Sequence, residues 1–144
     1  MRALLDVNVL IALFDEEHTA NGKAHDWLDS NKTHGIATCP LTENGLVRIL
    51  SHTGYRSRLD YPPSFFVKNL DQFSRANDHE FWPDDLSLRD ASVFDVDYMV
   101  GSKQITDLYL LGLAVRKGGR LVTLDRKINL AAVRGATAEN LCVI

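Results

Sequence analysis

Two carboxylates stand directly after short apolar runs near opposite ends of the chain. Asp6 follows the run 3–5, and Asp125 follows the run 121–124. If these runs are neighbouring parallel strands, both carboxylates lie at the carboxyl edge of the sheet, where ligands bind in open α/β folds. The competing interpretation is structural, because an Asp between a strand and a helix often caps that helix.

Two further acids occupy the first turns of predicted helices. Glu43 is followed by apolar residues three, four and seven positions later, and Asp107 has apolar residues at the same helical spacing. Each acid therefore shares a face with the core side of its helix. Taken singly, either one is typical of an acid that stabilises a helix dipole. Taken together with Asp6 and Asp125, they predict four carboxylates at one edge of the core.

Four carboxylates at close range repel one another, and a divalent cation would neutralise them. Oxygen ligands favour Mg²⁺ or Mn²⁺ over zinc, and no Cys/His pair has zinc-finger spacing. A cation held this way supports phosphodiester hydrolysis without a protein nucleophile. No G-x-S-x-G motif or Cys-His arrangement offers competing chemistry.

Composition predicts one domain over residues 1–144. Hydrophobic residues make up 45% of the chain, which is enough for a core, and the net charge is −3. The negative charge argues against binding nucleic acid through bulk positive charge. The two cysteines lie in apolar runs, and we find neither a signal peptide nor a membrane span, so we expect a cytoplasmic protein.

The apolar pattern alternates short buried strands with amphipathic helices. This order predicts parallel β-α-β units in a three-layer α/β domain. The expected strands are 3–5, 35–39, 80–82, 121–124 and 141–144, and the expected helices are 9–14, 20–32, 40–51, 63–77 and 105–117. The segment 53–63 reads as a loop, and 84–101 has no clear pattern.

Three segments resemble, in order, the motifs of the PIN-domain ribonucleases, in particular the toxins of VapBC toxin–antitoxin pairs. LLDVNVLIALFDEEH (4–18) is similar to the opening motif, and PLTENGLVRIL (40–50) is similar to the second. QITDLYLLGLAVRKGGRLVTLDR (104–126) is similar to the third and fourth motifs run together. The order and spacing of these segments carry the resemblance, which covers nearly the whole chain.

The resemblance implies an α/β/α PIN-like fold with a mostly parallel five-stranded sheet and a Mg²⁺- or Mn²⁺-dependent endoribonuclease. It implies that Asp6, Glu43, Asp107 and Asp125 are catalytic, and that the three aspartates bind the metal. It also implies a homodimer and a cognate antitoxin that blocks the site. Lys103 departs from the pattern, because many relatives carry a His near that position.

Several polar side chains are expected to contact RNA or to orient water near the acids. Arginine can grip phosphate, and aromatic rings can stack on unpaired bases. The expected substrate-binding residues are Asn8, Arg48, Lys103, Thr123 and Arg126, with Arg56 and Arg58 in the loop 53–63 as further basic residues. For each basic residue taken alone, solvated surface charge is the competing interpretation.

Three other functions stay open at this point. A haloacid-dehalogenase phosphatase also opens with a strand ending in Asp, but it needs a second Asp where this chain has Asn8. A non-catalytic module that binds RNA or another partner would tolerate neutralisation of Asp6. A non-toxin PIN nuclease that processes RNA or cuts DNA would share the acidic site, although the short chain favours RNA.

Overall fold

The computed structural model describes residues 1–55 and 60–144, so the predicted RNA contacts Arg56 and Arg58 lie outside the described residues. Five parallel strands form one sheet in the order β3-β2-β1-β4-β5. The strands are β1 Ala3–Leu5, β2 Ile36–Thr38, β3 His79–Phe81, β4 Arg120–Thr123 and β5 Leu141–Val143. The chain starts in the centre at β1, builds one half outward to β3, and then crosses back to β4. The sheet therefore has its topological switch point between β1 and β4.

In the part of the chain that the structure describes, five α-helices connect or flank these strands. They are α1 Val7–Phe14, α2 Asn21–Asn31, α3 Pro40–Leu50, α4 Pro63–Ala76 and α5 Ile105–Arg116. Short 3-10 turns occupy Lys32–His34, Val96–Tyr98, Ser102–Gln104, Leu130–Ala132 and Ala138–Asn140. No helix in 1–55 or 60–144 is long and apolar enough to cross a membrane.

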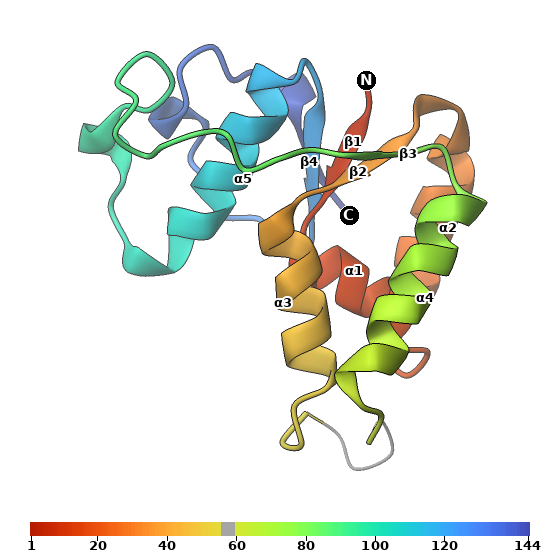
Figure 1. Ribbon diagram of the computed structural model, residues 1–144. Coiled ribbons are helices and arrows are strands. Elements are labelled where there is room, and N and C mark those ends of the chain that lie inside the picture. The colour runs from red at the N-terminus through yellow and green to blue at the C-terminus, as the bar shows by residue number, and fades with distance from the viewer. Residues whose placement is uncertain (56–59) are drawn as a thin grey trace.

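The sheet is covered on both faces, which makes three layers. Ala3 and Leu5 point to a core shared with α1, α2, α3 and α4, while Leu4 points to a second core built mainly on α5. Figure 1 shows α5 on one side of the sheet and α2 and α4 on the other. Strands buried on both faces read as continuous apolar runs, as parallel strands do. The predicted three-layer α/β/α fold with a five-stranded sheet is thereby confirmed.

The element boundaries differ from the predictions in ways that local chemistry explains. Helix α1 begins at Val7, two residues earlier than predicted, because Asp6 acts as its N-cap and accepts a hydrogen bond from the Val7 amide. Helix α5 ends before Gly118, whose φ of 66° suits the residue after a helix terminus. The unassigned segment 84–101 is largely irregular, with turns, the 3-10 helix Val96–Tyr98 and an isolated bridge from Phe94 to Val133. Phe94 is buried in the core on the α5 side.

Arg2 fastens the start of β3 to the sheet. Its guanidinium donates to the carbonyl oxygens of Ile36 (3.1 Å) and Asp78 (2.9 Å) and forms ion pairs with the carboxylates of Asp78 and Glu80, both at 3.0 Å. The side chain of Arg2 is only 21% exposed, so these bonds are partly protected from solvent. The first strand, the second strand and the entry to β3 are thus held together by one residue.

We expect Arg2→Met to lower the free energy of unfolding by about 1–2 kcal/mol, because charge-assisted hydrogen bonds to two strands are lost while the apolar stem remains. Urea denaturation measures the change. Arg75→Met is the matched control, since Arg75 also pairs with a carboxylate, that of Asp71, but its side chain is 79% exposed. Equal losses in the two variants would contradict a special role for Arg2.

Candidate active site

Asp6 and Asp125 meet at the switch point because β1 and β4 are hydrogen-bonded neighbours. Leu5 pairs with Val122 across the two strands, and the Asp6 amide donates to the Val122 carbonyl at 3.0 Å. Asp6 directly follows β1, and Asp125 follows β4 by two residues. Both carboxylates therefore lie at the carboxyl ends of adjacent parallel strands, which is where an open α/β sheet forms its ligand crevice.

The hydroxyl of Thr123 joins three parts of this edge. It donates to Asp6 Oδ2 (2.6 Å) and accepts from Asn8 Nδ2 (3.1 Å) and from the Asp125 amide (3.0 Å). A hydroxyl has one proton and two lone pairs, so these three bonds use its full capacity. Thr123 is completely buried, and the network fixes the orientation of the Asp6 carboxylate.

Asp125 does not cap a helix, in contrast to the structural interpretation that the sequence left open. A loop follows β4, and Asp125 Oδ1 accepts from the Lys127 amide at 2.8 Å, which orders the turn. Asn8 supports the same segment, because its Oδ1 accepts from the Leu124 amide at 3.1 Å. For Asp6 the capping role and the place at the strand end hold together, so the two interpretations do not exclude each other.

Asp107 enters this group from the first turn of α5. Its pKa is raised to about 6, chiefly by burial, and then by the charges of Asp6 and Asp125 and a hydrogen bond to Asp125. Burial also raises the pKa of Asp6, against the hydrogen bonds from Thr123 and Val7 that lower it, and the charge of Asp125 adds to the rise. We call Asp6, Asp107 and Asp125 the aspartate cluster, since their charges act on one another.

Glu43 has different partners. Thr38 Oγ1, at the end of β2, donates to Glu43 Oε1 at 2.6 Å, and His79 Nε2 lies 2.7 Å from the same hydroxyl. The four predicted acids thus divide into the aspartate cluster and a glutamate bonded to β2. Thr38 and His79 were not predicted as part of the site, because a Thr at the end of a strand and a His at the start of another give no distinctive signal in one sequence.

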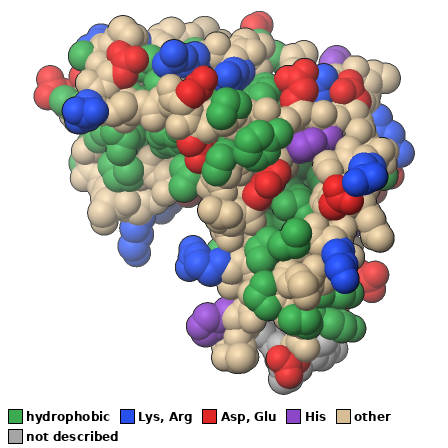
Figure 2. Space-filling model, viewed as in Figure 1, with side chains coloured by type: hydrophobic (Ala, Val, Ile, Leu, Met, Phe, Trp, Pro, Cys, Tyr) green, Lys and Arg blue, Asp and Glu red, His purple; other side chains and the backbone are tan. Residues whose placement is uncertain are grey.

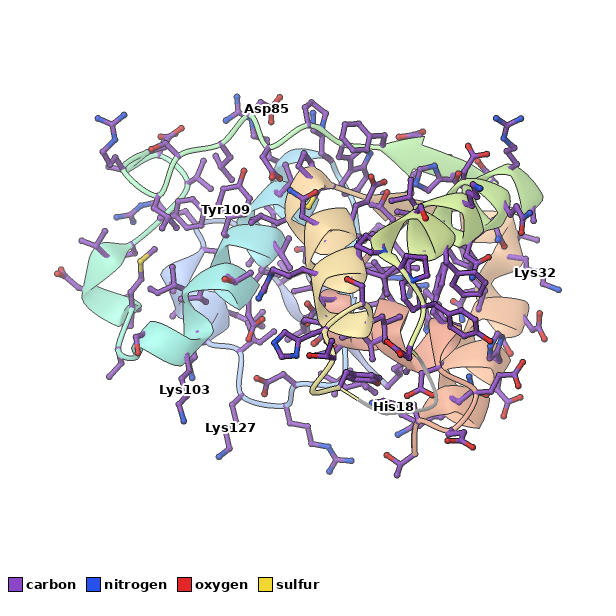
Figure 3. The ribbon with its side chains drawn as sticks, turned by 60° about the horizontal axis from the view of Figure 1, so that its bottom comes forward. His18, Lys32, Asp85, Lys103, Tyr109 and Lys127 are labelled. Carbon is purple, nitrogen blue, oxygen red and sulfur yellow. The ribbon has the colours of Figure 1, made fainter. Side chains whose placement is uncertain are left out.

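The predicted basic contacts that lie within the described residues are at the surface. Arg48, Lys103 and Arg126 are exposed, and Arg48 lines an open groove of about 700 Å³ together with Asn44 and Val47 on α3. Figure 3 shows Lys103 and Lys127 projecting from the same edge of the molecule, and Gln104 Nε2 donates to the Lys127 carbonyl at 2.9 Å. Lys127 is therefore a further cation near Lys103, one that no sequence pattern singled out. On the face in Figure 2, acidic and basic side chains are interspersed.

The donor set of the aspartate cluster fits a hard divalent cation. As the side chains stand, no three His, Cys, Asp or Glu residues within 1–55 and 60–144 form a ready metal-binding group, so binding would require side-chain rotation. The carboxylates of Asp6, Asp107 and Asp125 nevertheless supply the oxygen ligands that Mg²⁺ and Mn²⁺ take in proteins. Asp6 keeps lone pairs on both oxygens beyond its bonds to Thr123 and Val7.

A three-layer domain with carboxylates at a β1/β4 switch point defines a class of α/β proteins with an acidic site, and comparisons with known proteins identify the family. The family model for the PIN domain matches residues 3–134. The chain therefore belongs to the PIN domain family.

The similarity to individual relatives extends over the whole chain. Ribonuclease VapC44 of Mycobacterium tuberculosis is 42% identical over 147 residues, which cover 100% of both chains. Ribonuclease VapC39 of the same organism is 39% identical over 135 residues, covering 94% of this chain and 96% of the relative. Within the PIN domain family, the chain is thus similar to the VapC ribonucleases, as the sequence motifs indicated.

A solved structure shows the same fold at much lower sequence identity. The crystal structure of VapBC2 from Rickettsia felis bound to a DNA fragment from their promoter matches with a TM-score of 0.54 and 13% identity. The match covers 87% of this chain and 89% of that chain. At this identity the likeness supports the fold alone.

Proposed function

We propose that the protein is an endoribonuclease that depends on Mg²⁺ or Mn²⁺ and is the toxin of a toxin–antitoxin pair. The observation that carries the proposal is the 42% identity to a ribonuclease VapC over the full chain. The aspartate cluster at the switch point supports it, because carboxylates are the residues that such chemistry needs.

In this proposal Asp6, Asp107 and Asp125 hold the cation. When bound, Mg²⁺ or Mn²⁺ supplies a more acidic water and neutralises charge on the scissile phosphate. Thr123 and Asn8 keep Asp6 and the 124–125 segment in place through the hydrogen bonds described above. We assign Glu43 to accept a proton from the attacking water at Oε2, since Thr38 engages Oε1.

Substrate binding is assigned to the cations around this edge. With a net charge of −3, the protein needs local positive charge to bring a phosphodiester to the acids. Lys103 and Arg126 flank Asp107 and Asp125 in sequence, and Lys127 lies near Lys103. Together with Arg48 and Asn8, they form the proposed substrate contacts. Thr123, predicted from the sequence as a further contact, is completely buried with its hydroxyl fully bonded, so its role is to hold Asp6.

The proposal includes the protein's partners. A cognate antitoxin would place an Arg side chain against the aspartate cluster, because a guanidinium satisfies paired carboxylates that lack a metal ion. We further propose a homodimer, and a cytoplasmic location follows from a cellular RNA substrate.

The test is RNA cleavage by the purified, antitoxin-free protein. We expect discrete cuts in total RNA and in structured RNAs with Mg²⁺ or Mn²⁺, and none with EDTA. Single-stranded DNA and duplex DNA of matching sequence serve as control substrates. Cutting that persists in EDTA would contradict metal dependence, and preferential cutting of DNA would contradict the ribonuclease assignment.

A further inference from the structure

A hydrogen-bonded chain connects Glu43 to the neighbouring strands. It runs from His79, the first residue of β3, through Thr38, the last residue of β2, to Glu43 in the first turn of α3. The two links measure 2.7 Å (His79 Nε2 to Thr38 Oγ1) and 2.6 Å (Thr38 Oγ1 to Glu43 Oε1). Both are short, and the link to the Glu43 carboxylate has the length typical of a hydroxyl that donates to an ionised acceptor.

The direction of the protons follows from the capacity of each group. An ionised Glu43 can only accept, so the single hydroxyl proton of Thr38 points to Oε1. The Thr38 oxygen then accepts from His79, which requires the imidazole tautomer with its proton on Nε2. Burial lowers the pKa of His79, which is consistent with a neutral ring in this role.

Both supports of Glu43 are held rigidly. Thr38 is completely buried inside the sheet, with β1 and β3 on either side of its strand. His79 pairs in register with Ile36, and Arg2 binds the backbone carbonyl of Asp78, the residue before it. Thr38 and His79 therefore have little conformational freedom. A glutamate side chain by itself has several rotatable bonds, so Glu43 gains its fixed orientation from them.

We infer that Thr38 and His79 are positioning residues that hold the Glu43 carboxylate for RNA cleavage. This inference rests on the proposed function. The hydrogen bond from the fixed Thr38 hydroxyl selects one orientation of the Glu43 carboxylate and leaves Oε2 free to accept the proton of the attacking water. Small errors in the placement of a catalytic group lower reaction rates strongly. The competing explanation is that the chain only satisfies the buried hydroxyl of Thr38.

A matched pair of variants separates these explanations. Thr38→Val keeps the shape of the side chain but removes the hydroxyl, and Thr38→Ser keeps the hydroxyl. We expect Thr38→Val to lower kcat about 10-fold with little change in KM, as loss of a supporting hydrogen bond does in other sites. Thr38→Ser should restore most of the rate, and Thr38→Val should have no further effect in a Glu43→Gln background.

A second readout does not depend on activity. Nitrogen chemical shifts of the His79 ring, measured by NMR, should show the Nε2–H tautomer in the wild type and in Thr38→Ser. Thr38→Val should weaken that preference towards the ratio of a solvated imidazole, because Nε2–H then loses its fixed oxygen partner. An Nδ1–H tautomer in the wild type would overturn the hydrogen-bonded chain itself.

The outcomes for the inference and for the proposed function are distinguishable. If the wild type cuts RNA and folded Thr38→Val cuts at the same rate, the positioning role is wrong and the ribonuclease assignment stands. If the wild type cuts no RNA, the proposed function is wrong. The positioning role of Thr38 and His79 in RNA cleavage is then wrong as well, whatever tautomer His79 adopts.

Discussion

Asp6→Asn is expected to lower the rate of metal-dependent RNA cleavage by at least about 100-fold, the upper range for residues that merely support metal ligands. Asp6 is the proposed ligand whose carboxylate is most firmly placed, between the Val7 amide and the Thr123 hydroxyl. An amide in its position offers one neutral oxygen in place of a carboxylate. Single-turnover cleavage of an end-labelled RNA at saturating Mn²⁺ measures the loss.

The same variant should remain folded. Its amide oxygen can still cap α1, and removal of a buried charge whose pKa is raised favours folding. Against this, the amide nitrogen would face the Thr123 hydroxyl, whose two lone pairs already accept from Asn8 and from the Asp125 amide. These effects oppose each other, so we expect the melting temperature to change by only a few degrees.

Asp71→Asn is the matched control for Asp6→Asn. Asp71 is an exposed acid on α4 that pairs with Arg75 and lies outside the aspartate cluster. This control should cleave at the wild-type rate. Equal activity of wild type, control and a folded Asp6→Asn protein would refute the assignment of Asp6.

Asp107→Asn is expected to change how the stability of the metal-free protein depends on pH. The pKa of Asp107 is about 6 in the folded protein against 3.8 for an ordinary Asp. Between these values the folded state binds more protons than the unfolded state, so the free energy of unfolding falls as pH rises from about 4 to about 6. After allowance for partial exposure, the Asp107 contribution amounts to roughly 1–2 kcal/mol.

Urea denaturation in EDTA at half-unit pH steps measures this contribution as the difference between wild type and Asp107→Asn. The difference should grow in favour of the variant up to about pH 6 and stay constant above pH 7. Asp26→Asn, at an exposed acid on α2, controls for a general effect of net charge. A flat difference curve for Asp107→Asn would contradict the raised pKa of Asp107, to which burial and the charges of Asp6 and Asp125 contribute.

Much of the fold was predictable because the signals are local. Buried parallel strands such as 3–5 and 121–124 are recognisable as short apolar runs. The start of the helix 40–50 is indicated by Pro40, which occupies its first position. The segment 84–101 could not be assigned, since turns that contribute single buried residues such as Phe94 have no period. The early start of α1 could not be predicted because it depended on whether Asp6 caps the helix. In the structure Asp6 both caps α1 and belongs to the aspartate cluster.

The site was predictable only in part, for reasons of geometry. The order of strands places Asp6 beside Asp125, and helical spacing turns Asp107 toward the core, so these positions follow from pattern and topology together. The partners of Glu43 depend on the pairing of β2 with β3 and on side-chain rotamers, which one sequence does not encode visibly. The assignment of these residues to metal binding and catalysis stays a prediction.

The most direct test of the central claim is Mn²⁺ binding, measured by isothermal titration calorimetry on the antitoxin-free protein. The account predicts saturable binding to the wild type that is strongly weakened in both Asp107→Asn and Asp125→Asn and unchanged in Asp71→Asn. Folded wild-type protein that binds no Mn²⁺, or aspartate variants that bind it as tightly as the wild type, would contradict the claim that these three aspartates form a metal site.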